Sequence, residues 1–332
     1  MIREDKRMPK YLIIGCIGTD HIIFPDGRTE THAGGDAYYA AAGARIWSSD
    51  VGIAAVIPKN YPQELIDKLS RAGIDVSGII RTNLKMGLEG TIEYKDDGSR
   101  VLGAAKGILK FLQDHLPGVL ALVANPYWEK VSAQPELIPE SYMQAEAVFL
   151  ASMAYSNQAK ALRLFDGKAA HIVLDPPPLM PWVKRGTPPK ELADLSRVSA
   201  VLPSEQEAYE YFGDGIAPDS AAEKFFSMGA QCVVYKMGGH GARVYGKGNQ
   251  AVHVPVYRTK AVDPTGAGDS FGGGFLVGLA ETGDPVKAAC YGAVSASFII
   301  EGYGADYALG VTRDQAEDRL KKLLEKLQLP NG

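Results

Sequence analysis

Cysteine is scarce in this chain, and long apolar runs are missing. The 332 residues include only Cys16, Cys232 and Cys290, which lie far apart in apolar surroundings. Three separated cysteines make neither a disulfide framework nor a metal cluster, so we expect buried, reduced thiols. The apolar runs fall well short of the roughly 20 residues that a membrane helix needs. The sequence therefore predicts neither a disulfide-stapled small domain nor a membrane-spanning chain.

A large excess of charge of either sign is also missing. The formal net charge is −4, from 35 basic and 39 acidic side chains. Such a balance gives no electrostatic footprint for nucleic acid or for a membrane surface. Residues 1–7 are charged, and no secretory signal is recognisable. We therefore expect a cytoplasmic protein without nucleic-acid or membrane partners.

What the chain has in quantity is apolar residues and glycine. Hydrophobic residues make up 46% of the sequence, and there are 37 glycines. This composition is typical of a globular enzyme with a large core and many turns. The length fits either two domains or one large α/β domain with an insertion. No internal repeat or low-complexity segment is visible.

Short β-rich runs alternate with helical patterns through the middle and the end of the chain. Such alternation predicts βαβ units around a mostly parallel sheet. The expected core strands are residues 11–17, 51–57, 119–123, 147–150, 172–174, 200–202 and 232–236. The expected helices are residues 36–47, 62–72, 157–165, 205–212 and 218–228, a helix that starts at Asp284-Pro285 and stops at Gly302, and an amphipathic helix at 313–327.

Two β-rich regions interrupt this alternation. Residues 21–28 resemble a hairpin with Asp26-Gly27 as its turn, and residues 90–102 read as a second strand–turn–strand unit. Together they could form a small sheet beside the main domain. The alternative is a pair of separate surface hairpins.

Residues 263–269, Asp-Pro-Thr-Gly-Ala-Gly-Asp, form the most informative pattern in the chain. A β-prone segment precedes it and a helix-compatible run follows, so Gly266, Ala267 and Gly268 lie where a loop becomes a helix N-terminus. Backbone N–H groups and the helix dipole make such a place an anion site, and small residues let a phosphate approach. Asp269 would repel that phosphate unless it accepted a proton from a hydroxyl attacking the γ-phosphorus of ATP. The alternative is an ordinary glycine-rich loop followed by an acid that favours the dipole.

This pattern resembles the C-terminal signature, Asp-Thr-x-Gly-Ala-Gly-Asp, of the PfkB or ribokinase-like family of carbohydrate and nucleoside kinases. Pro264 replaces a usual Thr, and the resemblance extends from Tyr11 to about Leu309. It implies that the backbone of residues 266–268 forms an anion hole and that Asp269 is the catalytic base. It also implies ATP as phosphoryl donor, with Mg²⁺ bridging the phosphates.

The resemblance further implies one ribokinase-like domain over residues 1–332. Its fold would be a three-layer α/β/α sandwich with a mostly parallel central sheet and a small β-sheet lid. Residues from about 20 to 33 and from about 84 to 104 would form that lid over the sugar site. In such proteins the lid is often the dimer contact, so a homodimer is expected.

On the acceptor side, Asp20 follows the first expected strand, where open α/β sheets bind ligands. The resemblance implies that Asp20 binds sugar hydroxyls; the alternative is an ordinary turn residue. Gly34-Gly35 and Asp36 enter a helix and resemble the family's Gly-Gly-x-x-x-Asn motif, so Asp36 is either a substrate contact or an early-turn acid. Tyr39 replaces the Asn that contacts the sugar. Its ring suits stacking on a ligand or walling it off, which points to an acceptor other than ribose unless the ring is plain core.

On the nucleotide side, Ser204 and Glu207 align with the family's Asn-x-x-Glu motif, with Ser in place of Asn. The resemblance implies that Glu207 organises Mg²⁺ through water, whereas Ser-x-x-Glu before a helix is also a capping box. Lys236, Gly238 and Gly241 match a strand end along which relatives bind ATP. Lys236 could approach phosphates or be an ordinary exposed strand-end lysine.

Two further patterns resemble a Walker A loop and a monovalent-cation site. The spacing of Gly241, Gly246 and Lys247 imitates a Walker A loop, but Gly248 follows where Ser or Thr is required, and no helix begins there, so we reject it. Asp263 corresponds to the first Asp of the signature. The resemblance makes it a candidate ligand for a monovalent cation such as K⁺, and the alternative is that it stabilises its own turn.

The sequence therefore predicts an ATP-dependent kinase that phosphorylates a hydroxyl group, preferentially a primary one, of a monosaccharide or sugar-like acceptor. Tyr39, with the aromatic residues Phe24 and Tyr94 of the expected lid, leaves a nucleoside kinase as the alternative. A nucleotide-sensing relative without activity is the rival from another class, favoured by Tyr39 and Ser204 and opposed by Asp269. A dinucleotide-dependent oxidoreductase is disfavoured, because the first strand is not followed by Gly-x-Gly-x-x-Gly.

Overall fold

The computed structural model describes residues 8–84, 87–96, 100–102, 115–180, 183–248 and 250–327. Its main element is a nine-stranded sheet in the order β13-β12-β11-β10-β9-β8-β1-β4-β5. Neighbouring strands from β11 to β5 are parallel, and the two pairs at the other edge, β11–β12 and β12–β13, are antiparallel. The strands are β1 (Tyr11–Ile14), β4 (Val51–Pro58), β5 (Asp75–Thr82), β8 (Ala147–Leu150), β9 (His171–Leu174), β10 (Ala200–Val201), β11 (Cys232–Lys236), β12 (Ala242–Gly246) and β13 (Val252–Val254).

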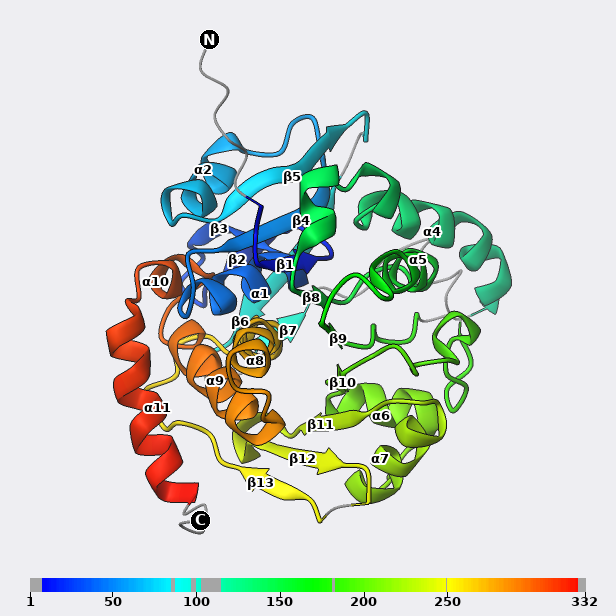
Figure 1. The fold of residues 1–332 in the computed structure, drawn as a ribbon. Coiled ribbons are helices and arrows are strands. Elements are labelled where there is room, and N and C mark those ends of the chain that lie inside the picture. Colours follow the sequence, from blue (N-terminus) through cyan, green and yellow to red (C-terminus); the bar gives the residue numbers. More distant parts are fainter. Residues whose placement is uncertain are drawn as a thin grey trace.

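Helices cover both faces of this sheet (Figure 1). One face packs against α1 (Asp36–Arg45), α2 (Gln63–Arg71), α8 (Ala267–Thr282), α9 (Pro285–Ile299), α10 (Asp306–Leu309) and α11 (Arg313–Leu327). The other face packs against α4 (Pro117–Val131), α5 (Tyr155–Phe165), α6 (Glu205–Phe212) and α7 (Pro218–Ser227). The predicted three-layer α/β/α fold is therefore confirmed.

The buried strand β1 shows why the sheet has a helix layer on each side. Tyr11 and Ile13 belong to the core on the α8 side, and Leu12 and Ile14 belong to the core on the α5 side. Successive side chains of a strand point to opposite faces, so a strand that is apolar at every position is stable only when both faces are covered. All four residues of β1 are buried.

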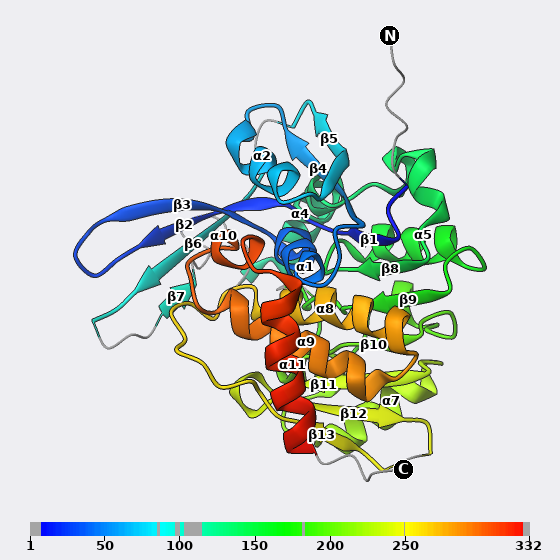
Figure 2. The same cartoon turned by 60° about the vertical axis from the view of Figure 1, so that its left-hand side comes forward.

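A second, four-stranded sheet projects from the main body near α1 and α10 (Figure 2). Its order is β3-β2-β6-β7, and β2 and β6 are parallel while the outer pairs are antiparallel. The predicted hairpin around Asp26-Gly27 joins β2 and β3. The strands are β2 (Gly18–Ile23), β3 (Thr29–Gly34), β6 (Leu88–Tyr94) and β7 (Arg100–Leu102). We call this element the small sheet; residues 85–86, 97–99 and 103–104 of the expected lid lie outside the described residues.

Helix α8 is enclosed on several sides, and its glycines make this possible. A Cβ atom on Gly273 would overlap the carbonyl oxygen of Ala40 in α1, and one on Gly272 would overlap the ring of Phe149 in β8. A Cβ on Gly43 of α1 would in turn overlap the backbone of Ser270. Because interiors are packed as densely as crystals, only glycine lets the α1 and α8 backbones come this close. The contact fixes helices α1 and α8 relative to each other.

Most predicted elements agree with the structure to within a few residues, and one is wrong. The apolar run 119–123, predicted as a strand, lies inside helix α4. A short apolar run fits a buried strand or a helix equally well, so periodicity could not decide. The first expected strand, 11–17, ends at Ile14, and β2 of the small sheet begins at Gly18.

The three cysteines are free and buried, in keeping with the expected reduced thiols. Within the described part of the chain, no helix has the length and apolarity needed to cross a bilayer.

Candidate active site

The Gly-Ala-Gly segment forms the start of α8, as its pattern predicts. Gly266 is the residue before the helix and has a left-handed backbone (φ 75°, ψ 3°), and no side chain caps this helix end. Gly266 also lies directly beneath the ring of Tyr39, where a Cβ atom would overlap the ring. Gly268 is exposed. An uncapped helix N-terminus with an exposed glycine in its first turn is open to an anion. We call residues 266–268 the cradle.

Asp269 follows the cradle and is half-buried beside Asp36, the first residue of α1. The two carboxyl groups are within hydrogen-bonding reach of each other. Desolvation, and next the charge of Asp36, raise the pKa of Asp269 well above that of an ordinary aspartate, and the Lys236 ammonium opposes the rise. Desolvation also raises the pKa of Asp36. Two carboxyl groups this close share a proton more readily than both ionise.

Lys236, at the end of β11, is the cation of this cluster. Its Nζ lies 2.8 and 2.7 Å from the two carboxylate oxygens of Asp175. The lysine is therefore not the ordinary exposed strand-end residue of the alternative interpretation, since its side chain is only 12% exposed. Nearby carboxylates, Asp175 and Glu207 first among them, raise its pKa against the opposing effect of burial. The ammonium group stays charged in this setting.

Asp175 was not singled out from the sequence. It follows β9 directly, and its side chain is 5% exposed. The signal was available, because an acid just after a buried parallel strand lies at the carboxyl edge of the sheet, where such folds bind ligands. The argument that points to Asp20 applies equally to Asp175, which stands between this strand and three consecutive prolines.

Ser204 and Glu207 form the capping box of α6. The Ser204 hydroxyl accepts a hydrogen bond from the Glu207 amide (3.3 Å), and the Glu207 carboxylate accepts one from the Ser204 amide (2.6 Å). The capping role of these two residues, which was the alternative to a metal-linked role, is therefore present in the structure. The Lys236 amide donates a hydrogen bond to the carbonyl of Pro203 (2.8 Å), so the end of β11 lies next to this cap. The negative charge of Glu207 therefore acts on Lys236 and Asp269 and raises the pKa of each.

Asp20 lies inside β2 of the small sheet instead of in a loop after β1. Its carboxylate accepts a hydrogen bond from the Tyr39 hydroxyl (3.2 Å). Gly34 and Gly90 lie on either side: a Cβ on Gly34 would overlap the carboxylate, and one on Gly90 would approach it to 2.6 Å. Desolvation raises the pKa of Asp20, and the Tyr39 hydrogen bond partly offsets this. The glycines therefore make room for this carboxylate.

Tyr39 links the two halves of the site. It is 3% exposed, its hydroxyl reaches Asp20, and its ring covers Gly266. The tyrosine at the family's Asn position is thus a buried core residue whose hydroxyl is hydrogen-bonded, and it is not an open stacking platform. Gly35 precedes α1 with φ 93°, and a Cβ there would approach the Cys16 carbonyl oxygen to 2.6 Å, so the turn before Asp36 requires glycine.

Gly238 and Gly241 form the turn after β11. Both have positive φ values, 53° and 87°. A Cβ on Gly241 would overlap the backbone of Val254, whereas nothing lies within 4 Å of one on Gly238. Gly241 is therefore explained by the fold, and Gly238 faces open space. The Walker A-like spacing of Gly241, Gly246 and Lys247 runs along β12, and the next element is β13, not a helix.

Asp263 is buried, with 1% exposure, just before the cradle. Its Oδ1 accepts hydrogen bonds from the amide and the hydroxyl of Thr265, at 2.9 and 2.7 Å. Its own amide binds the Ile300 carbonyl at the end of α9. Asp263 thus stabilises its own turn, and among the described residues no group of three His, Cys, Asp or Glu side chains is arranged to hold a metal ion.

The aromatic residues of the small sheet pack on one another. Phe24 and Tyr94 are stacked at 6.2 Å, and both meet the edge of Tyr303 in the segment after α9. Phe24 is only 8% exposed. These rings join the small sheet to the main body and leave little ring surface for a ligand.

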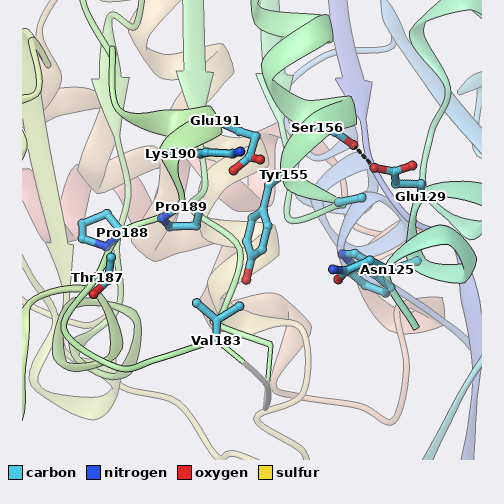
Figure 3. Close-up of a pocket in the computed structure, with 12 residues that line it drawn as sticks. Asn125, Glu129, Tyr155, Ser156, Val183, Thr187, Pro188, Pro189, Lys190 and Glu191 are labelled. Atoms are coloured by element: carbon cyan, nitrogen blue, oxygen red, sulfur yellow. Dashed lines mark hydrogen bonds between the residues drawn. The ribbon is translucent and has the colours of Figure 1, made fainter. Parts of the chain in front are cut away.

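A cavity of about 390 Å³ lies apart from these residues, between α4, the start of α5 and residues 183–191. Figure 3 shows Tyr155 in its middle, with Asn125 and Glu129 on one side and Thr187 and Pro188 on the other. None of the site residues predicted from the sequence lines it.

Comparisons with known proteins agree with the resemblance noted in the sequence. A family model described as pfkB family carbohydrate kinase matches residues 10–310. A cytidine kinase of Thermococcus kodakarensis is 30% identical over 278 residues, which cover 83% of this chain and 90% of the relative. A ribokinase of Haemophilus influenzae is 24% identical over 92% of this chain and 96% of its own. The solved ribokinase of Giardia lamblia superposes with a TM-score of 0.72 at 20% identity, covering 95% of this chain and 99% of its own.

Proposed function

Because the chain belongs to the PfkB family of carbohydrate kinases, we propose that it transfers the γ-phosphoryl group of ATP to a hydroxyl, preferably a primary one, of a monosaccharide or sugar-like acceptor. The observation that supports this most is the position of Asp269. A half-buried carboxyl group lies in the first turn of a helix whose N-terminus is uncapped, one residue beyond the cradle, and within the field of a buried lysine. A base beside an anion site is what phosphoryl transfer to an alcohol requires.

In this proposal the reaction proceeds by direct displacement. The acceptor oxygen forms a bond to the γ-phosphorus, the bond to the β–γ bridging oxygen breaks, and ADP leaves. Asp269 takes the hydroxyl proton, which its raised pKa favours. The amides of the cradle and the Lys236 ammonium stabilise negative charge on the transferring group. Phosphoryl transfer asks mainly for positioning and charge stabilisation, so these few groups suffice.

The residues present fit a Mg²⁺ ion that is held mainly by substrate phosphates and water. No cage of three acids exists among the described residues, and Mg²⁺ commonly binds substrate phosphates with one or two carboxylates and water. Glu207 would hold the ion through water, because one of its oxygens is already used in the cap of α6. The bound ion would neutralise phosphate charge. We propose that K⁺ binds near Asp263 and activates the enzyme, which the comparison of rates with and without K⁺ tests.

Asp20 would orient the acceptor. Its carboxylate lies between glycines of the small sheet and receives one hydrogen bond from Tyr39, which leaves acceptor capacity for substrate hydroxyls. Tyr39 reaches from Asp20 to Gly266, so the same side chain borders the acceptor and the cradle. In this role the small sheet is a lid over the acceptor.

A nucleoside is the second candidate acceptor, favoured by the cytidine kinase relative, which this chain matches over most of its length. The aromatic residues Phe24 and Tyr94 support it less than their sequence positions suggested, because they pack on Tyr303.

The test is an acceptor panel of monosaccharides, polyols and nucleosides with ATP and Mg²⁺, with and without K⁺, read by ADP release. We expect the highest kcat/KM for a monosaccharide or polyol. A preference for nucleosides would establish the second candidate instead. ATP binding without turnover on any acceptor would contradict both and would favour a nucleotide-sensing protein.

The Asp36–Asp269 pair gives a pH prediction. Asp269 acts as a base only when ionised, so activity rises with pH through its raised pKa. Asp36→Asn removes a charge that contributes to this rise. We therefore expect the acid limb of kcat/KM to move to lower pH in the variant, measured by initial rates across a pH series. An acid limb that stays in place or moves to higher pH would show that Asp36 does not act on the base.

A further inference from the structure

The pair formed by Lys236 and Asp175 is the most strongly enclosed charge pair near the cradle. Both carboxylate oxygens lie within 2.8 Å of Nζ, and the two side chains are 12% and 5% exposed. Two of the three ammonium N–H groups are thus directed to Asp175, which leaves the third for another acceptor. A buried pair of this kind contributes little net stability compared with apolar packing, so its presence calls for another explanation.

Gly268 shows where the remaining side of the ammonium lies. A Cβ atom on Gly268 would have only one neighbour within 4 Å, the Nζ of Lys236 at 3.6 Å. Gly268 has no positive φ and lies within helix α8, so neither backbone conformation nor crowding demands a glycine there. The missing side chain keeps the space between the ammonium and the exposed first turn of α8 open. The ammonium therefore forms one wall of the cradle.

Backbone contacts hold both members of the pair in place. The Asp175 amide binds the Leu150 carbonyl (2.9 Å), and its carbonyl accepts a hydrogen bond from the buried Gln158 side chain (2.8 Å). The Lys236 amide binds the Pro203 carbonyl (2.8 Å). Asp175 directly follows β9 and Lys236 is the last residue of β11, with β10 between the two strands. The fixed carboxylate receives the ammonium group and so gives the Lys236 side chain that spans this gap a defined direction.

We propose that Asp175 is a positioning residue that holds the Lys236 ammonium against the cradle, so that Lys236 meets the terminal phosphates of the bound nucleotide. This inference rests on the proposed function. It gives a role to a residue outside the sequence motifs and explains the glycine at position 268. Asp175 itself acts through Lys236 and does not contact the phosphates.

The experiment is a double-mutant cycle of Asp175→Asn and Lys236→Met in the full chain. In the wild-type background we expect Asp175→Asn to lower kcat by about 10- to 100-fold, somewhat less than loss of a direct transition-state donor, with the acceptor KM nearly unchanged. In the Lys236→Met background the same substitution should change kcat by less than about threefold, because a residue that acts only through Lys236 has nothing left to position. An equal loss in both backgrounds would overturn the proposal.

A binding measurement separates this inference from the proposed function. Calorimetry with a non-hydrolysable ATP analogue and Mg²⁺ needs no acceptor and no turnover. Asp175→Asn should weaken binding in the wild-type background and leave it unchanged in the Lys236→Met background. Unchanged binding in both backgrounds contradicts the inference. A chain that phosphorylates no acceptor refutes the proposed function, and this comparison still decides the role of Asp175.

Two further variants guard against a purely structural effect. Asp175→Glu keeps the charge and displaces it by one methylene, so we expect a folded protein with partly restored kcat. Asp166→Asn is the matched control, since Asp166 pairs with Arg197 at 2.8 Å on the exposed surface. It should leave kcat unchanged. If Asp175→Glu folds normally and lowers kcat as far as Asp175→Asn does, the exact position of the carboxylate matters, which supports the positioning role. If Asp175→Glu restores kcat fully, Asp175 supplies charge alone and the positioning role is wrong.

Discussion

Asp269→Asn is expected to abolish most phosphoryl transfer, lowering kcat by about 10²- to 10⁴-fold, the usual worth of a general base. The amide keeps the size of the side chain and its place beside the cradle, but it cannot take the proton of the attacking hydroxyl. Nucleotide binding should survive, because the cradle amides and Lys236 are unchanged. ADP release under saturating acceptor measures the loss, and calorimetry with ATP and Mg²⁺ measures binding.

The fold should tolerate this substitution. Asp269 lies within reach of Asp36, and replacing one of two close carboxyl groups removes repulsion in a desolvated place. We expect an unchanged or slightly higher melting temperature. Near-wild-type turnover by a folded Asp269→Asn protein would mean that the base has been assigned wrongly. Asp166→Asn, an equal change of charge on the surface, serves as the control.

Gly268→Ala is expected to separate activity from stability. The new methyl group meets only the Lys236 ammonium, at 3.6 Å, in the space assigned to the phosphates. We expect kcat/KM for ATP to fall by about 10- to 100-fold, comparable to loss of one stabilising donor. The free energy of unfolding should rise by about 0.5–1 kcal/mol, because alanine is the better residue inside a helix.

Initial rates and chemical denaturation test both halves of this expectation. Gly310→Ala is the matched control, since Gly310 lies outside the site and its Cβ would make an ordinary contact of 3.5 Å with Tyr307. Gly266→Ala provides the contrast, because its left-handed backbone and the ring of Tyr39 oppose any side chain, and it should lose stability. Full activity in Gly268→Ala would show that phosphates do not occupy the cradle.

The sequence predicted the parts of the site that are local. The cradle and Asp269 are consecutive residues, so their positions at the start of α8 follow from one strand–loop–helix pattern. The capping box of Ser204 and Glu207 is local in the same sense. The sequence pattern is compatible with both helix capping and a metal-linked role, and it does not distinguish between them.

Contacts between distant residues could not be read in this way. Asp175 and Lys236 are 61 residues apart, and their pairing depends on the order β9-β10-β11, which no short pattern specifies. The meeting of Asp36 and Asp269 depends on the close approach of α1 and α8. Tyr39 was recognised as a departure from the family motif, but its hydrogen bond to Asp20 required the fold to bring the small sheet back over α1.

The backbone contact between α1 and α8 also limits how the protein can move. Asp36 and Asp269 lie in the first turns of two helices whose backbones meet closely at Gly43 and Gly273, where an added Cβ atom would overlap the facing helix. Because packing of this density resists displacement, we expect the Asp36 and Asp269 carboxyl groups to keep a fixed separation. If the small sheet is the proposed lid, we expect it to hinge in the chain segments that join it to the main body, so that entry and exit of an acceptor leave this carboxyl pair in place.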